Sequence, residues 1–325
     1  MKAVLCKQYG LPDTLVLDDV PSLVPAAGQV VVSMKAAGVN FPDALIIQGK
    51  YQVKPPMPFS PGSELAGVVK LVGEGVQNIK IGDAVIAYAG YGGYAEEIAV
   101  DARACIPMPA GVDFKVAASF MMTYGTSYHA LKDRAQLQPG ETLLVLGAAG
   151  GVGSAAVELG KLMGARVIAA ASSDDKLAAC RALGADAGIN YSSEDLREGV
   201  KRITEGRGVD VVYDPVGDKF AEPAMRDMAW GGRYLVIGFA GGEIPKIPLN
   251  LPLLKGFSIV GVFWGSFTRK EPKKNEANVR ELLGWIAGGK LKPLVSAAYP
   301  LAQAARALKD VMERKVKGKV VLVPN

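Results

Sequence analysis

The stretch Leu143-Leu-Val-Leu-Gly-Ala-Ala-Gly-Gly-Val-Gly153 decides the fold of the second half of the chain. Its four leading apolar residues predict a buried strand, and the glycines after them predict a tight turn that opens a helix over 154–163. Glycine permits such a turn and lets a pyrophosphate approach the backbone without meeting a Cβ atom. The free N–H groups and the positive dipole end of the helix favour phosphate. The stretch therefore predicts a dinucleotide site with contacts from Ala149, Gly150, Gly151 and Val152.

Around this stretch, strand-like and helix-like segments alternate from about residue 121 onward. Alternation at this spacing indicates a parallel sheet with crossover helices. The strands are rich in Val, Ile and Leu, as expected where helices cover both faces of a sheet. We therefore predict a Rossmann doubly wound domain. Its strands are expected at 143–146, 166–170, 209–213, 232–237 and 257–263.

Residues 1–120 consist of short apolar runs broken by glycine and proline, which is typical of a β-rich domain. From about 272 the sequence predicts a helix, a strand, a second helix and a final strand at 319–323, and we assign this block to the β-rich domain. The expected fold is α/β. One domain comprises 1–120 and 270–325, and the other comprises 121–269.

The bulk composition excludes several classes of protein. Among 325 residues, the net charge is +5 without a long basic run, which argues against nucleic-acid binding. No apolar run approaches the ~20 residues that span a bilayer, and the N-terminus lacks the features of a signal peptide. Three scattered cysteines suit a reducing compartment. We expect a cytoplasmic protein that binds neither membrane nor nucleic acid.

The single histidine, His129, limits the chemistry further. A zinc site needs about four clustered ligands, or three and a water molecule, and the chain has neither a second histidine nor a C-x-x-C pair. His129 lies in a helix-like segment without a G-x-S-x-G motif nearby, so a serine-hydrolase triad is disfavoured. We interpret His129 as a structural or surface residue and expect no metal.

The residues after the second predicted strand indicate the type of dinucleotide. An NAD site normally has Asp or Glu at this strand tip to hold the ribose 2′-OH. Here the tip carries Ser172 and Ser173, followed by Lys176, and these groups suit a 2′-phosphate. We interpret Asp174 and Asp175 as the acidic first turn of the next helix. The pattern favours NADPH, although NADH would be preferred if one of these carboxylates turned back to the ribose.

Later strand tips supply further candidates, because ligands of such sheets lie at the carboxyl ends of the strands. Tyr191, in Ile189-Asn-Tyr191, lies at the tip of the next strand after 166–170 and could pack beside the 2′-phosphate. Val216 lies in Asp214-Pro-Val-Gly217, Phe239 follows the predicted strand 232–237, and Phe263 ends the predicted strand 257–263. Plain core packing is the alternative interpretation of these apolar residues.

Several motifs of this chain resemble those of one known family. They are Ala36-Ala-Gly-Val-Asn-Phe-Pro-Asp43, Pro61-Gly-Ser-Glu-Leu-Ala-Gly67, Gly147-Ala-Ala-Gly-Gly-Val-Gly153, Leu183-Gly-Ala-Asp186, Asp214-Pro-Val-Gly217 and Gly318-Lys-Val-Val-Leu-Val-Pro324. Over nearly its whole length the chain resembles the zinc-free, NADPH-dependent quinone oxidoreductases, or zeta-crystallin-like group, of the medium-chain dehydrogenase/reductase superfamily. The resemblance implies a GroES-like catalytic domain for the β-rich part.

Zinc alcohol dehydrogenases of the same superfamily carry Cys and His where this chain has Asn40 and Phe41, and G-H-E where it has Gly62-Ser63-Glu64. They also carry a four-cysteine lobe that has no counterpart here. The resemblance therefore implies reduction of an acceptor that needs no Lewis acid, such as a quinone or an α,β-unsaturated carbonyl compound.

The resemblance also implies roles for individual residues. Asn40 and Tyr51 match the polar active-site positions, and either could donate a hydrogen bond to a developing oxyanion. Thr126 matches a cofactor contact, and so does Lys319 near the C-terminus. Leu45 departs from the tyrosine that family members often have, so the substrate pocket is expected to differ.

The expected activity is transfer of a hydride from NADPH to a quinone or similar electron-poor acceptor. The first alternative is a reductase of enals, enones or acyl-CoA enoates, for which the basic residues between Arg269 and Lys274 could contact CoA phosphates. The second alternative is an NADPH-binding, crystallin-like protein without activity. The apolar run 257–263 would be hazardous as an uncovered sheet edge, so we expect a homodimer, as the resemblance also implies.

Overall fold

The computed structural model describes all residues from Met1 to Asn325, and they form two compact units. Unit 1 comprises Met1–Met122 and Pro293–Asn325, and unit 2 comprises Thr123–Lys292. The first boundary lies close to the predicted one. The second lies later, so residues 270–292 belong to unit 2 and not, as predicted, to the β-rich domain.

The reason for this difference is the packing of α10 (Pro272–Ala287) within unit 2. Tyr128 donates a hydrogen bond to Glu281 and packs its ring edge to face with Trp285, at 5.3 Å between ring centroids. Asn278 donates a hydrogen bond to Asp133 at 2.8 Å. These contacts join segments far apart in the chain, which the helical periodicity of α10 alone does not reveal.

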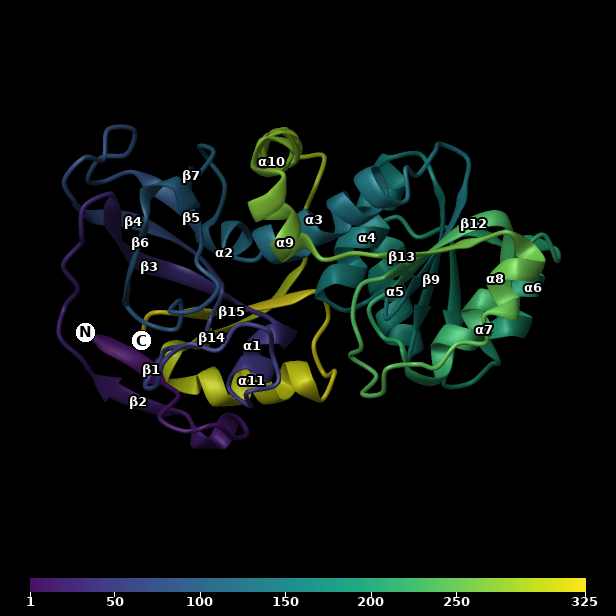
Figure 1. Ribbon diagram of the computed structural model, residues 1–325, viewed down its shortest axis with the longest axis horizontal. Helices are drawn as coiled ribbons and strands as arrows, with labels where there is room; N and C mark the ends of the chain where they lie inside the picture. The colour runs from purple at the N-terminus through teal and green to yellow at the C-terminus, as the bar shows by residue number, and fades with distance from the viewer. The chain divides into compact units, whose positions relative to one another are not determined.

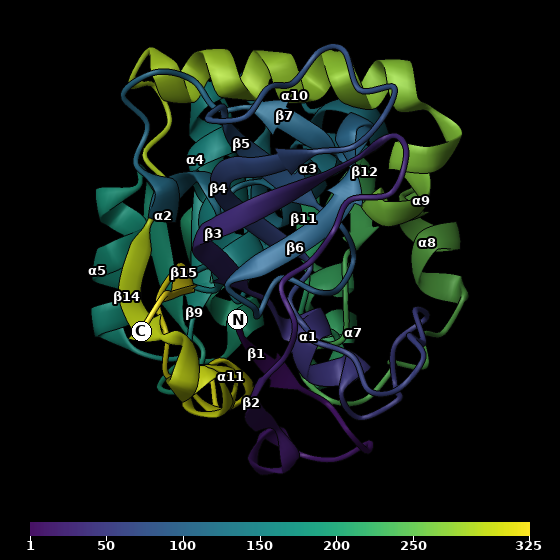
Figure 2. The ribbon, with the colours of Figure 1, turned by 90° about the vertical axis from the view of Figure 1, so that its left-hand side faces the viewer.

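Unit 1 is built on a seven-stranded sheet with the order β14-β15-β3-β4-β5-β7, and β6 also pairs with β3 (Figure 2). The strands are β3 (Gln29–Val39), β4 (Glu64–Val72), β5 (Ala84–Tyr88), β6 (Glu97–Asp101), β7 (Cys105–Pro107), β14 (Val295–Pro300) and β15 (Lys319–Val323). A separate antiparallel pair consists of β1 (Lys2–Leu5) and β2 (Val16–Asp19). Helix α11 (Ala304–Met312) packs on β14, β15 and β3, while α2 (Phe114–Ala117) contacts β3 and β4.

The core of unit 1 lies between these strands and α11. Val30, Val32 and Leu65 are fully buried, and so are Leu308 and Leu322 from the C-terminal segment. The last strand pairs antiparallel with β3 and thereby brings residue 319 to the end of β3. The predicted return of the chain terminus to the β-rich, GroES-like domain is confirmed.

Unit 2 is a parallel sheet with the order β10-β9-β8-β11-β12-β13, drawn in teal and green in Figure 1. The strands are β8 (Thr142–Leu146), β9 (Arg166–Ala171), β10 (Ala187–Asn190), β11 (Val209–Asp214), β12 (Met228–Val236) and β13 (Ser258–Gly261). The order reverses direction after β8, whose neighbours are β9 and β11. This is the Rossmann arrangement, in which ligands bind at the carboxyl ends of the strands near the reversal.

Helices cover both faces of this sheet, because right-handed crossovers on either side of the reversal place them on opposite faces. The helices of unit 2 include α3 (Met121–Tyr128), which begins in unit 1, α4 (Gly151–Leu162), α5 (Asp174–Ala182), α6 (Leu196–Thr204), α7 (Ala221–Arg226), α8 (Asn250–Lys255) and α9 (Trp264–Lys270). Helix α4 packs on β8 and β9, while α7 packs on β11 and β12. No helix of the chain is both long and apolar enough to cross a bilayer.

Candidate active site

The turn between β8 and α4 has the geometry of a phosphate-binding loop. Gly147 has φ +58°, and its carbonyl oxygen accepts a hydrogen bond from Gly150 N at 2.9 Å. A Cβ atom on Gly153 would lie 2.3 Å from that same oxygen, so only glycine lets the helix start so close to the turn. The helix begins at Gly151, earlier than predicted, and its first N–H groups face the turn.

Helix α3 is hydrogen-bonded to the first turn of α4, next to this loop. The hydroxyl of Ser127 donates to the carbonyl of Val152 at 3.0 Å. Since this uses its only hydrogen, the 2.8 Å contact with Tyr213 is a bond that the tyrosine donates. Thr126, the predicted cofactor contact, is the half-buried residue beside Ser127.

The tip of β9 gathers the predicted phosphate ligands. Ser173 is the N-cap of α5 and accepts a hydrogen bond from Lys176 N, while the Lys176 ammonium lies 3.0 Å from Ser172 Oγ. Asp174 lies in the first helical turn, as predicted, and its carboxylate accepts a hydrogen bond from Asn190 at 3.0 Å. This bond uses one acceptor position of the Asp174 carboxylate and links it to the end of β10.

Tyr191 lies directly after β10, and its ring packs against Phe220 at 4.6 Å between ring centroids. Its backbone N–H donates to Ala171 O at 3.1 Å, which ties the tips of β9 and β10 together. The predicted group Ser172, Ser173, Lys176 and Tyr191 therefore shares one corner of the sheet.

Asp214 forms the turn at the tip of β11, a role that the sequence analysis did not assign. Its carboxylate accepts hydrogen bonds from Val216 N at 2.7 Å, from Gly217 N at 2.8 Å and from the Tyr234 hydroxyl. Burial raises the pKa of Asp214 above its usual range. In the sequence, only the presence of an aspartate in the motif 214–217 could have indicated that this residue holds the turn.

Phe239 follows β12 and lies against the backbone of Gly217, where an added Cβ atom would come within 2.9 Å of its ring. Phe263 follows β13 and is 50% exposed. Together with the turn after β8, the tips of all six strands thus carry predicted residues. Because the sheet is parallel, these residues share one edge of unit 2.

In unit 1, Asn40 follows β3 and is the N-cap of α1 (Phe41–Ile46). Its amide donates to Glu64 Oε1 at 2.9 Å, and its carbonyl oxygen accepts from the Lys319 ammonium at 2.5 Å. The ammonium also donates to Val39 O at 2.9 Å and to Glu64 Oε1 at 3.0 Å. All three hydrogens of Lys319 are therefore used inside unit 1, and the structure gives this lysine a role in holding Asn40.

A second buried pair extends this network. Asp43 accepts hydrogen bonds from Asn40 N at 2.8 Å and from the Tyr94 hydroxyl at 2.9 Å. Burial raises the pKa of Asp43 to about 6, against the opposing effect of these two bonds. Neither Glu64, Asp43 nor Tyr94 was predicted as a site residue.

Tyr51 lies in the loop after α1, where its half-buried ring packs against the core of unit 1. His129 is buried, contacts Asp133 at 2.8 Å and stacks on Phe267 at 3.8 Å between ring centroids. The structural interpretation of His129 is confirmed.

Comparison with known proteins follows the division into two units. A family model described as an alcohol dehydrogenase GroES-like domain matches residues 26–110, and one described as a zinc-binding dehydrogenase matches residues 151–284. A quinone oxidoreductase-like protein 2 homolog of Nematostella vectensis is 39% identical to the chain and aligns with 99% of it and 88% of the relative.

Solved structures agree with this assignment. The quinone oxidoreductase of Escherichia coli, crystallised with NADPH, matches with a TM-score of 0.93 and 30% identity, covering 100% of both chains. An enoyl reductase, CurK, matches with a TM-score of 0.89 and 27% identity, covering 100% of this chain and 99% of the other.

The word zinc in one family description can be tested against the side chains. No three His, Cys, Asp or Glu residues cluster in a way that could hold a metal ion. Asn40 is committed to Glu64 and Lys319, and the buried Ser63 hydroxyl has no hydrogen-bond partner and offers only one neutral oxygen. These residues do not fit zinc. The chain belongs to the quinone oxidoreductase-like family of the medium-chain dehydrogenase/reductase superfamily.

Proposed function

We propose that this protein is an NADPH-dependent oxidoreductase that reduces a quinone or a similar electron-poor acceptor without zinc. The observation that carries the proposal is the tip of β9. There Ser172, Ser173 and Lys176 form a cationic, hydroxyl-rich corner, while Asp174 is bonded to Asn190. Such a corner attracts a 2′-phosphate, which a carboxylate at the strand tip would repel.

The rest of the edge fits a dinucleotide. The turn 147–153 leaves the backbone bare of side chains where a pyrophosphate would lie, and the N-terminus of α4 adds N–H donors. Thr126, Ala149, Gly150, Gly151 and Val152 are proposed to contact it. NADPH, when bound, supplies a hydride, and a quinone that takes up this hydride and a proton becomes a hydroquinone.

Further along the edge, Tyr191 would pack beside the 2′-phosphate, while the apolar side chains of Val216, Phe239 and Phe263 would line the remainder of the cofactor. In unit 1, Asn40 is proposed as the polar group that contacts the acceptor. Glu64 takes one N–H of its amide, so the second N–H can donate to a developing oxyanion. Tyr51 is proposed as a second donor.

A quinone needs no Lewis acid, because reduction to an aromatic hydroquinone is already favourable. Simple aldehydes lack this advantage and usually depend on a metal ion for activation. Asn40 is hydrogen-bonded to the ion pair of Lys319 and Glu64, and Ser63 offers only a neutral hydroxyl. Both observations support metal-free chemistry.

Two alternatives predict different results. An enone or enoyl-CoA reductase is supported by the likeness to the enoyl reductase CurK, and an inactive NADPH-binding protein would need only the edge of unit 2. NADPH oxidation should be measured with 1,4-benzoquinones, enones and crotonyl-CoA. Turnover of quinones is expected. Turnover of CoA thioesters alone would favour the first alternative, and tight NADPH binding without turnover would favour the second.

The cofactor preference has its own experiment. Replacing Lys176 by Ala should raise the Kd for NADPH at least tenfold, because the 2′-phosphate loses a charge-assisted hydrogen bond worth about 1.5–3 kcal/mol, while the Kd for NADH should change little. The exposed Lys290, also in unit 2, provides the matched control Lys290→Ala. Equal losses of NADPH and NADH affinity would remove the phosphate assignment.

We also propose a cytoplasmic homodimer. The three cysteines are all buried and free, which suits a reducing compartment. Strand β13 lies at the end of the sheet of unit 2, pairs only with β12 and exposes 41% of Ile259. Pairing with a second copy would cover this edge.

A further inference from the structure

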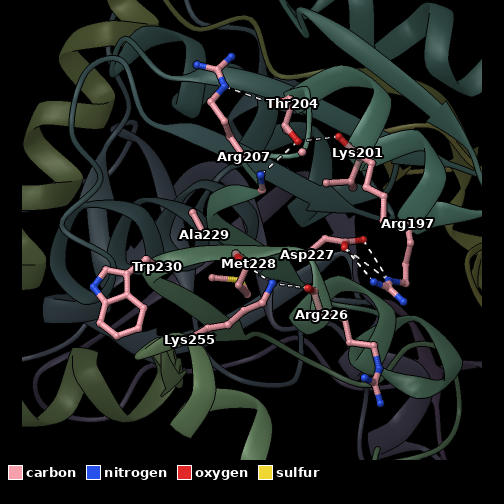
Figure 3. Close-up of a pocket in the computed structure, with 13 residues that line it drawn as sticks. Arg197, Lys201, Thr204, Arg207, Arg226, Asp227, Met228, Ala229, Trp230 and Lys255 are labelled. Carbon is pink, nitrogen blue, oxygen red and sulfur yellow. Dashed lines mark hydrogen bonds and ion pairs between the residues drawn. The ribbon is translucent and has the colours of Figure 1, made fainter.

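The amino-terminal edge of the sheet in unit 2 carries a pocket of about 410 Å³ (Figure 3). Its walls come from one side of α6, the loop before β11, the end of α7 and the start of β12, with Lys255 from the end of α8. Because the strands are parallel, this edge is opposite to the one that carries the candidate cofactor residues. The volume is in the range of small-molecule sites, and none of the predicted residues lines it.

Positive side chains dominate the lining of this pocket, which we call the basic pocket. Five cationic residues line it against one carboxylate, Asp227. The cations are Arg197, Lys201, Arg207, Arg226 and Lys255. They come from four separate segments of the chain, so helical periodicity does not account for their convergence.

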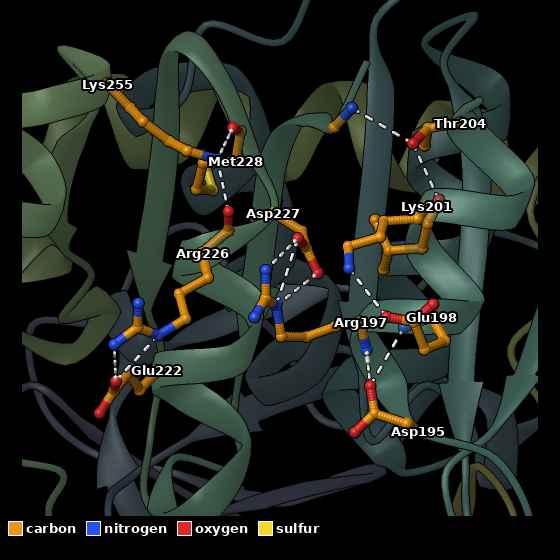
Figure 4. A network of polar contacts seen from close by, with 12 residues as sticks. Asp195, Arg197, Glu198, Lys201, Thr204, Glu222, Arg226, Asp227, Met228 and Lys255 are labelled. Carbon is orange, nitrogen blue, oxygen red and sulfur yellow. Dashed lines mark hydrogen bonds and ion pairs between the residues drawn. The ribbon is translucent and has the colours of Figure 1, made fainter. Parts of the chain in front are cut away.

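Two of these cations, which we call the floor cations, are held by groups that themselves line the pocket (Figure 4). Arg197 contacts the buried carboxylate of Asp227 at 3.3–3.4 Å, and Lys255 donates to Met228 O at 3.0 Å and to Arg226 O. The contacts to carbonyl oxygens use hydrogens of the ammonium but leave its charge unneutralised. The floor cations therefore give the pocket a positive potential that favours binding of an anion.

The other three cations, which we call the rim cations, pair with carboxylates that do not line the pocket, and Arg226 contacts Glu222 at 2.5 Å. Lys201 contacts Glu198 at 2.8 Å, and Arg207 lies 4.0 Å from Glu205. The side chains of these two glutamates are 71% and 83% exposed, so each pair is worth only about 0–1 kcal/mol. A ligand with several anionic oxygens can therefore bind Lys201 and Arg207, and breaking their present ion pairs loses little free energy.

An aromatic side chain completes the lining. Trp230 is 82% exposed although it belongs to a strand, and it borders the pocket beside Lys255 (Figure 3). One edge of its indole packs near Gly256, which leaves a broad apolar face uncovered. A planar ring on a ligand would gain stacking contact with that face.

We propose that the basic pocket binds a nucleoside polyphosphate, with the phosphates between the rim and floor cations and the base on Trp230. This site goes beyond the proposed oxidoreductase function and does not depend on it. The negative phosphates would complement the positive charge of the lining, and the base would stack on the exposed ring of Trp230 next to it.

The test is calorimetric titration of the full-length protein with ADP and, separately, with inorganic pyrophosphate. The variant Lys201→Gln/Arg207→Gln should weaken both ligands at least about tenfold, since each charged hydrogen bond lost is worth about 1.5–3 kcal/mol. Trp230→Leu should weaken ADP several-fold, roughly the loss of one stacking contact, and leave pyrophosphate unchanged.

Two comparison variants locate the site. Arg280→Gln/Lys290→Gln removes the same charge from exposed positions of unit 2 outside the pocket and should change neither affinity. Gly153→Ala perturbs the turn 147–153 at the other edge of the sheet, where a diphosphate would bind to the cofactor site, and should also leave ADP unchanged. The proposal is overturned if wild-type protein binds neither ligand, if the exposed pair weakens binding as much as the pocket pair, or if Gly153→Ala weakens ADP and the pocket pair does not.

Discussion

The ammonium of Lys319 lies 3.0 Å from Glu64 Oε1 in the interior of unit 1, where both side chains are at most 5% exposed. The two residues come from the last strand of the chain and from the start of β4, and Asn40 bonds to both of them. The second carboxylate oxygen of Glu64 accepts from Met122 N at 2.8 Å. The buried ion pair is thus fully hydrogen-bonded, and it holds the amide of Asn40 in one orientation.

Breaking this pair from one side should be costly. Lys319→Met leaves a buried carboxylate unpaired, and we expect a loss of about 3–5 kcal/mol in the free energy of unfolding. Urea denaturation measures this loss. The double variant Lys319→Met/Glu64→Met should be more stable than Lys319→Met alone, and equal stabilities of the two would contradict an energetic coupling of the pair.

Much of unit 2 could be predicted from sequence, because its elements are specified locally. Each signal lies within a few neighbouring residues of the chain. These signals are the glycines at 147–153, the serines at the tip of β9 and the apolar runs of the strands. A parallel sheet then brings the strand tips together without further information, which is why Lys176 and Tyr191 were placed correctly at one corner.

The network around Asn40 could not be predicted in the same way. Glu64 and Lys319 are separated by 255 residues, and a single sequence gives no sign that they meet. Lys319 was therefore predicted as a cofactor contact, whereas the structure uses its three hydrogens within unit 1. The assignment of residues 270–292 was wrong for a similar reason, because α10 is held by long-range contacts such as Asn278 with Asp133.

The buried carboxyl group of Asp43 should make stability depend on pH. Burial raises its pKa from 3.8 to about 6, so the folded state binds the proton more tightly than the unfolded state does. The free energy of unfolding therefore falls as pH rises from about 4 to 6. In Asp43→Asn, the amide oxygen can still accept from Asn40 N and Tyr94. The stability of this variant relative to wild type should rise over that window by up to roughly 3 kcal/mol and then level off.

Urea denaturation at pH 4, 5, 6 and 7 measures that difference. A pH-independent offset from the extra amide hydrogens is expected, so the rise between pH 4 and pH 6 is the decisive quantity. A difference that is flat across the series would show that Asp43 titrates normally in the folded protein.

The close approach of α4 to the turn makes a prediction for Gly153. In Gly153→Ala the new Cβ atom would lie 2.3 Å from Gly147 O and 2.9 Å from Ala148 Cα, and neither backbone atom can move without opening the turn. We expect at least tenfold weaker NADPH binding, measured by fluorescence titration, and lower stability. Gly284→Ala, in the last turn of α10 with open space around it, should instead raise stability by up to about 1 kcal/mol. Wild-type NADPH affinity in Gly153→Ala would contradict the assignment of the turn.

The exposed edge of β13 gives a prediction for assembly. Ile259 lies on this edge strand and is 41% exposed, and a lysine there would place a charge in any strand pairing between two copies. We expect Ile259→Lys to shift the sedimentation equilibrium from dimer to monomer while leaving the far-UV circular dichroism unchanged. Ile81→Lys, at a 64% exposed position of unit 1, is the control and should remain dimeric. A dimer that persists in Ile259→Lys would show that a different surface joins the two copies.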